Sequence, residues 1–183
     1  ILTMAGFPQS TIHSNKPLKS LGDLKGMKMA TSSRVAATLL KSLGAQPLTF
    51  PLPMMYMQLQ KKVVDGIYMQ WTAFQPFRLY EVTKYHLDGG FGSATGAIFM
   101  MKKRFDGLPS AAKKALLKHS GEAHSRSFGQ HWDKWGGRGR QMTAKKGGHI
   151  IGRLSDSDEA KLAKSAQALI KGWVKRIPDG QQV

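Results

Sequence analysis

The sequence predicts an α/β fold, in which short strands alternate with helices around a shared core. Between residues 16 and 66, apolar runs of strand length alternate with segments whose apolar residues recur at helical spacing. Glycine and proline separate these runs where the chain must turn. With 183 residues, of which 41% are hydrophobic, the chain is long enough and apolar enough to bury a core.

The first elements follow from local composition. Residues 1–15 begin apolar and become polar, which predicts a strand that runs into a loop. A capped turn that ends at Gly26 then leads into a buried strand over residues 27–31.

The next segment predicts a helix, because its apolar residues fall on one helical face: Val35, Leu39, Leu40 and Leu43. Ser32 or Ser33 can cap the start of this helix, and Gly44 stands just past its end. Residues 47–50 form the next predicted strand, and residues 54–61 form the next helix.

A further strand is predicted around residues 63–68, and aromatic side chains gather along and after it: Tyr68, Trp71, Phe74, Phe77 and Tyr80. The carboxyl end of a strand is where α/β proteins bind ligands, although such a cluster also suits a core. We therefore single out Trp71 as a candidate ligand contact. The structural alternative is a core tryptophan whose indole N–H is satisfied by backbone.

The second half of the chain is predominantly helical in pattern. Strands are predicted over residues 81–87 and 95–101, with a glycine-rich segment between them. A long helical region begins near residue 108, and the glycines of residues 136–140 predict an interruption. A final helix begins near residue 155, with an apolar stripe of Leu162, Ala166, Leu169, Ile170 and Trp173.

The charge of the chain is strongly positive, with 28 Lys and Arg residues against 11 Asp and Glu residues and a net charge of +17. Such a surface attracts small carboxylates and phosphate backbones alike, or simply keeps the protein soluble. The run at residues 134–140 combines cations, glycines and Trp135, a composition that suits single-stranded nucleic acid. A module that binds nucleic acid or another polyanion nonspecifically is therefore the alternative function.

Several kinds of site are excluded or unsupported. The chain has no cysteine, so it has no disulfide, thiolate nucleophile or thiolate metal site. His119, His124 and His131 lack the spacing and the carboxylates of a metal site, and we expect no metal and no cofactor. We find no nucleophile with a base, no paired carboxylates and no phosphate-binding glycine loop, so we expect no enzyme. No apolar run reaches the roughly 18 residues that a membrane-spanning helix needs.

Five segments carry a resemblance to a known family: KPLKSLGDLKGMK, LLKSLGAQPL, YMQLQKKVVDG, RLYEVTKYH and FDGLPSAAKKALL. In this order and spacing they resemble the solute-binding subunits of tripartite ATP-independent periplasmic (TRAP) transporters. The resemblance implies a fold like that of type II periplasmic binding proteins, with two α/β lobes joined by crossing strands and a long helix. It also implies a periplasmic protein, with any signal peptide upstream of residue 1, that delivers a small organic acid to membrane permease subunits.

The resemblance also implies a division of the chain. Residues 1–16 would form a crossover strand and hinge, and residues 17–95 the second α/β lobe. Residues 96–183 would supply a return strand and C-terminal helices that complete the first lobe, whose opening strands are absent. The C-terminal segment GWVKRIPDGQQV would stop early. A homo-oligomer is one way to cover the sheet edge that an incomplete lobe exposes.

The residues that correspond to the family's ligand site are altered. The arginine that binds the ligand carboxylate corresponds to Ala30, and a second arginine of related members corresponds to Arg34. The polar residue usual after the Asp-Gly pair is missing from residues 67–71, which include Met69, and a later asparagine corresponds to Met101.

These changes predict a pocket for an aromatic or apolar acid. Tyr68 and Trp71 would stack on the body of the acid, while Gln70 and Arg34 would make the polar contacts. Ala30 and Met69 would line the pocket. The remaining alternative is a degenerate family member that binds nothing, and we expect no specific binding of nucleic acid.

Overall fold

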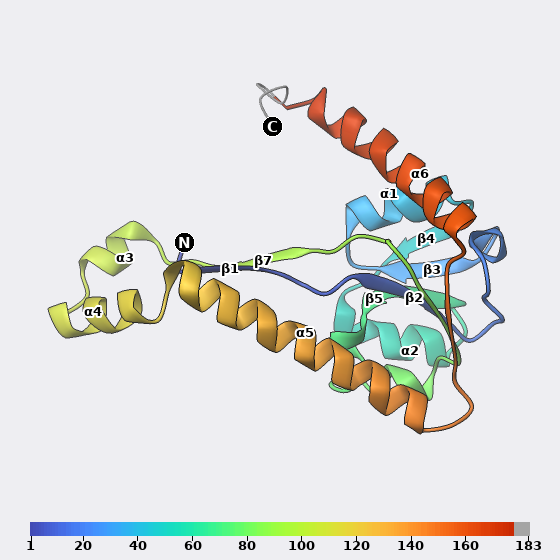
Figure 1. The fold of residues 1–183 in the computed structure, drawn as a ribbon, viewed down its shortest axis with the longest axis horizontal. Coiled ribbons are helices and arrows are strands. Elements are labelled where there is room, and N and C mark those ends of the chain that lie inside the picture. Colours follow the sequence, from blue (N-terminus) through green and yellow to red (C-terminus); the bar gives the residue numbers. More distant parts are fainter. Residues whose placement is uncertain (178–183) are drawn as a thin grey trace.

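A six-stranded mixed sheet organises most of the chain, which the computed structural model describes from residue 1 to residue 177 (Figure 1). The strand order is β4-β3-β5-β2-β6-β8. The strands are β2 (Ser10–Ser14), β3 (Lys28–Thr31), β4 (Gln46–Thr49), β5 (Gly66–Gln70), β6 (Tyr85–Asp88) and β8 (Ile150–Arg153). β3 runs parallel to β4 and β5, β6 runs parallel to β8, and β2 runs antiparallel to both of its neighbours. The predicted α/β class is confirmed.

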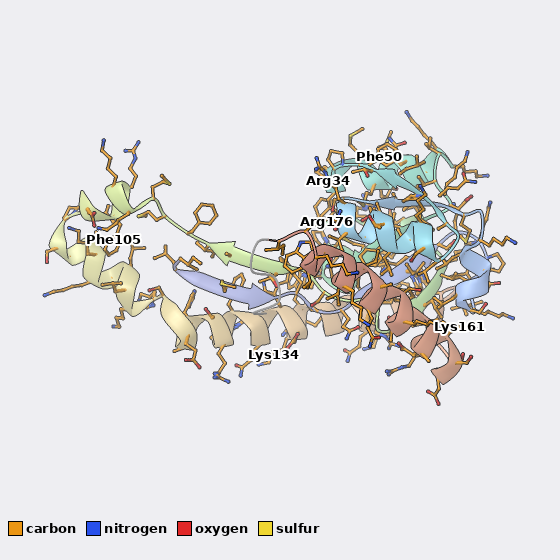
Figure 2. All side chains as sticks on the ribbon, turned by 90° about the horizontal axis from the view of Figure 1, so that it is seen from above. Arg34, Phe50, Phe105, Lys134, Lys161 and Arg176 are labelled. Carbon is orange, nitrogen blue, oxygen red and sulfur yellow. The ribbon has the colours of Figure 1, made fainter. Side chains whose placement is uncertain are left out.

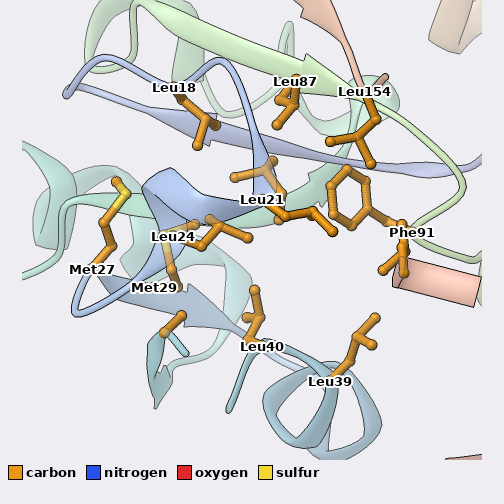
Figure 3. Close-up of a cluster of buried hydrophobic side chains, with 13 residues drawn as sticks. Leu18, Leu21, Leu24, Met27, Met29, Leu39, Leu40, Leu87, Phe91 and Leu154 are labelled. Atoms are coloured by element: carbon orange, nitrogen blue, oxygen red, sulfur yellow. The ribbon is translucent and has the colours of Figure 1, made fainter. Parts of the chain in front are cut away.

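Two apolar clusters cover the two faces of this sheet. Along β3, Met29 belongs to the first cluster and Ala30 to the second, because successive strand residues point to opposite faces. Helices α1 (Arg34–Ser42) and α6 (Asp156–Val174) supply leucines to the first cluster, which Figure 3 shows. Helix α2 (Met55–Gln60) closes the second cluster. We call the sheet with these three helices the body.

Short 3-10 turns connect several of these elements. They are η1 (Leu21–Leu24), η2 (Leu52–Met54), η3 (Trp71–Ala73) and η4 (Leu79–Glu81). The predicted strand over residues 81–87 therefore begins later than expected, at Tyr85, because residues 79–81 form a turn.

A second region, which we call the arm, extends away from the body (Figures 1 and 2). In the arm, β1 (Thr3–Gly6) pairs antiparallel with β7 (Thr95–Ile98), and the small helices α3 (Lys102–Asp106) and α4 (Ser110–Lys118) form its far end. Figure 2 labels Phe105 there. Helix α5 (Gly121–Lys145) runs back from the arm, packing on β1 and on η3, and so joins the two regions.

Residues 10–14 form a buried strand in the middle of the sheet, and the expected loop there was wrong. The segment is polar, but the side chains of Thr11, His13 and Ser14 find hydrogen-bond partners inside the protein. Thr11 Oγ1 donates to Asp88 Oδ1 at 2.8 Å, and Ser14 Oγ donates to the Asp65 carbonyl at 3.0 Å. Hydrogen bonding offsets the cost of burying these groups. A polar composition therefore does not exclude a buried strand here.

Helix α5 is continuous through residues 136–140, where the glycines predicted an interruption. Gly136 and Gly139 are buried, and a Cβ atom on Gly139 would lie 2.4 Å from the Trp71 carbonyl oxygen. These glycines therefore allow the helix to approach the body closely. Packing outweighs the low helix propensity of glycine at this position.

The predicted C-terminal segment, residues 96–183, is divided between the two regions. β7, α3 and α4 belong to the arm, whereas β8 and α6 lie with the body, and β8 was not predicted. Residues 178–183, which are half of the segment expected to stop early, lie outside the described residues. The division into a complete and an incomplete lobe stays a prediction. Within residues 1–177, no helix has the length and apolar character needed to cross a bilayer.

Candidate ligand site

A cavity of about 790 Å³, which we call the large cavity, lies where β3 and β5 end. Its walls come from the start of α1, the second half of α6, the segment 91–94 and the chain before β2. The lining residues that matter below are Ser10, Ser33, Tyr68, Met69, Gln70 and Arg176. A cavity beyond the carboxyl ends of strands in an open α/β sheet is the usual place for a small ligand.

The cavity wall is apolar with a sparse set of polar groups. Phe91, Leu169 and Trp173 contribute apolar surface, and no Asp or Glu of residues 1–177 lines the cavity. Arg176, just beyond α6, is the one charged side chain among the described lining residues. The wall therefore favours a ligand that has an apolar body and a negative charge.

A second cavity of about 440 Å³ adjoins the first and shares Phe7, Leu52, Met69 and Gln70 with it. It continues between η3 and the aromatic residues of α5, among them Trp132. Two buried side-chain polar atoms of the described residues have no hydrogen-bond partner, Ser10 Oγ and Trp132 Nε1. Each belongs to a residue that lines one of these joined cavities.

Tyr68 positions one wall of the large cavity. Its hydroxyl donates to the Phe91 carbonyl at 2.6 Å and so holds the segment 91–94 against β5. The pKa of Tyr68 is raised because burial disfavours the phenolate, while the neighbouring Ser10 hydroxyl acts in the opposite direction. Tyr68 therefore faces the cavity as a neutral phenol whose hydrogen is already engaged.

The start of α1, part of which lines the cavity, carries backbone donors that have no acceptor within the helix. Thr31 Oγ1 accepts from Ser33 N at 3.2 Å, and Ser33 Oγ accepts from Ala36 N at 3.3 Å, which caps the helix. Arg34 and Val35 occupy the first two helical positions, whose N–H groups have no partner within the helix. No acceptor elsewhere in residues 1–177 takes these two hydrogens.

The structure separates the predicted site residues. Tyr68, Met69 and Gln70 line the large cavity together. Arg34 is exposed at the first position of α1, outside the set of lining residues, and Ala30 is fully buried in the second apolar cluster.

Trp71 lies apart from the large cavity. Its indole Nε1 donates to Asp88 Oδ1 at 2.8 Å, so its partner is a carboxylate rather than the backbone. The ring packs against His13, Phe74 and His86. Trp71 instead borders a polar cavity of about 550 Å³ that also contains Arg140, which is paired with Asp88.

Three histidines form a hydrogen-bonded chain behind β5. His13 Nε2 donates to the Met69 carbonyl at 3.0 Å, because a carbonyl can only accept. The neutral His13 ring then accepts at Nδ1 from His86 Nδ1 at 2.9 Å, and His86 Nε2 accepts from His149 Nδ1 at 3.0 Å. This pattern assigns one tautomer to each ring.

Burial keeps this histidine chain neutral. Burial lowers the pKa of His86 to about 3, because a protonated His86 would be desolvated and would repel a protonated His149, and it lowers the pKa of His13 well below its usual value. The pKa of His149 is lowered by burial and by Lys146 and Lys84. No group of three potential ligands in residues 1–177 is arranged to bind a metal.

Sequence analysis missed Phe7, Ser10 and Arg176 as cavity residues. Ser10 and Phe7 fell in the predicted loop and strand of residues 1–15, and Arg176 carried no motif. A signal was present in Ser32 and Ser33, which follow a strand directly, but the sequence identified them only as helix caps. Long-range packing brings these three residues to the wall of one cavity, and such packing leaves no local pattern in the sequence.

The family model described as "Bacterial extracellular solute-binding protein, family 7" matches residues 2–176. The chain belongs to this family. Family 7 proteins are receptors for transported solutes and not enzymes, as predicted, and the family gives the nucleic-acid alternative no support.

Relatives of known name are similar over part of their length. The chain is 32% identical over 105 residues to a solute-binding protein of Albidiferax ferrireducens, which covers 56% of this chain and 31% of the relative. It is 31% identical over 111 residues to the C4-dicarboxylate-binding periplasmic protein DctP of Rhodobacter capsulatus, which covers 60% of this chain and 33% of that protein. The matched part is thus about a third of each relative.

Solved structures of TRAP solute-binding proteins share the fold. One, from a marine metagenome, is specific for aromatic acid ligands and holds 3-hydroxybenzoate; it has a TM-score of 0.91 and 30% identity over 100% of this chain and 59% of its own. Another, from Rhodoferax ferrireducens with copurified benzoate, has a TM-score of 0.90 and 26% identity, again covering 100% of this chain and 59% of its own. This family 7 chain therefore has the TRAP solute-binding fold and spans about three fifths of each solved chain.

Proposed function

We propose that the protein captures a small organic acid with an aromatic or apolar body and presents it to the permease subunits of a TRAP-type transporter. The observation that carries this proposal is the chemistry of the large cavity. An apolar wall with Arg176, and without any carboxylate from residues 1–177, suits an anion that has a hydrophobic body.

The binding residues of this proposal differ in part from those predicted. Tyr68, Met69 and Gln70 remain, since they line the cavity, and Phe91 and Trp173 offer further aromatic surface. Methionine adapts its shape to an apolar ligand more readily than a branched side chain does. Aromatic acids bound by solved relatives support this choice of solute.

The partners and location follow from family membership. Named relatives are periplasmic binding proteins, and we propose a periplasmic location for this protein as well. We also retain the division into one complete and one partial lobe, with the solute between the body and the elements at the base of the arm.

Isothermal titration calorimetry tests the proposal with the purified protein and three acids: benzoate, 3-hydroxybenzoate and succinate. We expect saturable binding of the aromatic acids. We expect weaker binding of succinate, because its second carboxylate would be buried against the apolar wall of the cavity. A Leu169→Glu variant, which adds a carboxylate to the wall, is expected to abolish binding. Leu117→Glu, on an exposed position of α4, is the matched control.

Two outcomes would contradict the proposal. The first is a protein that binds none of the acids, as a degenerate family member would. The second is binding of single-stranded DNA that weakens steeply between two salt concentrations while the acids give no heat, because phosphate contacts are salt-dependent and a buried acid site is far less so.

A further inference from the structure

We infer that the acid is held at two polar ends: its carboxylate by the first turn of α1, and a second hydrogen-bonding group by the Ser10 hydroxyl. The solute class is then an organic acid with an apolar body and a hydroxyl or similar substituent on its far side. This inference rests on the proposed function and specifies its ligand.

The first turn of α1 is suited to an anion. The helix has nine residues, carries no acidic side chain in its first turn, and leaves the N–H groups of Arg34 and Val35 without a described acceptor. Helix N-termini attract anions through these donors and through the aligned peptide dipoles. Ser33 and Val35, on either side of Arg34, line the cavity, so the first turn of the helix stands at its wall.

Ser10 supplies an independent sign of a ligand. The residue is 1% exposed, it lines the same cavity, and its Oγ has no hydrogen-bond partner among the described residues. The neighbouring Tyr68 hydroxyl does not meet it with hydrogen-bond geometry and gives its own hydrogen to Phe91. A buried hydroxyl left unpaired is costly, so a partner from a ligand would relieve that cost.

The sheet places the two groups apart. β5 lies between β2, which carries Ser10, and β3, which leads into α1. Two interstrand spacings separate β2 from β3, which is about 10 Å. An aromatic ring with a carboxylate on one side and a hydroxyl on the other, with one hydrogen bond of about 2.9 Å at each end, is of this length. Tyr68 and Gln70, which share one face of β5 and line the cavity, would lie under the ring.

A pair of substitutions at Arg34 tests the helix-start anchor. Arg34→Ala removes the guanidinium but keeps the backbone N–H, whereas Arg34→Pro removes both. Proline suits this position, because it is the first of the helix and the preceding Ser33 is extended, with φ of −112° and ψ of 127°. For benzoate, we expect Arg34→Pro to bind about tenfold more weakly than Arg34→Ala. Equal affinities of the two variants overturn this anchor.

Ser10→Ala tests the second anchor by ligand preference. Wild type is expected to prefer 3-hydroxybenzoate over benzoate, and Ser10→Ala to reduce that preference about tenfold while benzoate binding is retained. Ser93→Ala, at an exposed serine of the same cavity, is the control that should keep the preference. Without ligand, Ser10→Ala should raise the midpoint of thermal unfolding, because an unpaired hydroxyl is removed. An unchanged preference overturns the two-ended ligand class.

Failure of this inference is distinct from failure of the proposed function. If wild type binds neither benzoate nor 3-hydroxybenzoate, the proposed function is rejected. If wild type binds both acids while the variants leave affinity and preference unaltered, the protein binds acids in another way, and the two anchors alone are rejected.

Discussion

In the body, the strand β2 is built mostly of polar residues and is completely buried; in the arm, Ile98, Phe99 and Met101 are apolar and exposed. Ser10, Thr11, His13 and Ser14 have almost no exposed surface, whereas Phe99 is 71% exposed and Met101 is 70% exposed. Burial in this protein therefore follows position in the sheet more than residue type. The body has two apolar clusters of its own, and the arm has none among the described residues, so it depends on α5 for support.

The largest expected effect comes from a core truncation in the body. Leu40 of α1 is fully buried in the first cluster, so Leu40→Ala should lower the free energy of unfolding by about 3 kcal/mol. Phe99→Ala, in the arm, should change it by less than about 0.5 kcal/mol. Urea unfolding followed by circular dichroism measures both. A large effect at Phe99 would mean that the arm has a core of its own.

The next effect tests how the two regions are joined. Gly139→Ala should destabilise the packing of α5 on the body by about 2 kcal/mol, because its Cβ would meet the Trp71 carbonyl oxygen. Gly137→Ala, with nothing within 4 Å of its Cβ, should instead stabilise the protein by about 0.5–1 kcal/mol. Thermal unfolding distinguishes the two signs. Stabilisation by Gly139→Ala would refute the close contact.

Acid should destabilise the body through its histidine chain. The folded pKa of His86, about 3, lies below the value of about 6.5 expected in the unfolded chain, so the unfolded state binds more protons between these values. The free energy of unfolding should fall as the pH drops below 6.5, by about 1.4 kcal/mol per pH unit for each histidine that stays neutral. His13 acts in the same direction.

Three groups near His86 and one beside His13 influence this pH effect. His149 and Arg140 lower the pKa of His86 and Asp88 raises it, whereas the Met69 carbonyl accepts from His13 and raises the pKa of that histidine. Urea unfolding at pH 7, 6 and 5 measures the slope. His119→Gln, at an exposed position in the arm, is the control and should keep the same slope. A flat profile in the wild type would show that the histidines are not neutral in the fold.

The smallest expected effect is that of a Trp71 substitution on ligand affinity. Trp71→Phe removes the indole N–H that Asp88 accepts but keeps an aromatic ring in the buried cluster. Since Trp71 does not line the large cavity, affinity for benzoate should stay within about twofold of wild type, with a modest loss of stability. Calorimetry measures the affinity. A much weaker complex would restore Trp71 as a ligand contact.

Local patterns predicted much of the body. Helical spacing of leucines located α1 and the apolar stripe of α6, and β-rich runs located β3 and β5, because these signals depend on residues near in sequence. The strand β8 and the turn at residues 79–81 were not predicted, because short segments have weak hydrophobic periodicity. Among the cavity residues, Tyr68, Met69 and Gln70 could be predicted because they stand at the carboxyl end of a strand. Ser10 and Arg176 could not, because their place depends on which segments pack beside that strand.

By itself, the sequence determined the α/β class, the family and the absence of cysteine chemistry, since alternation, motif order and composition are properties of the chain alone. Only the tertiary structure decided that β2 is buried, that α5 passes unbroken through its glycines, and that Trp71 faces Asp88 instead of the cavity. The physical reason is the same in each case. These features are set by contacts between segments far apart in sequence, whose hydrogen bonds and close packing outweigh local preference.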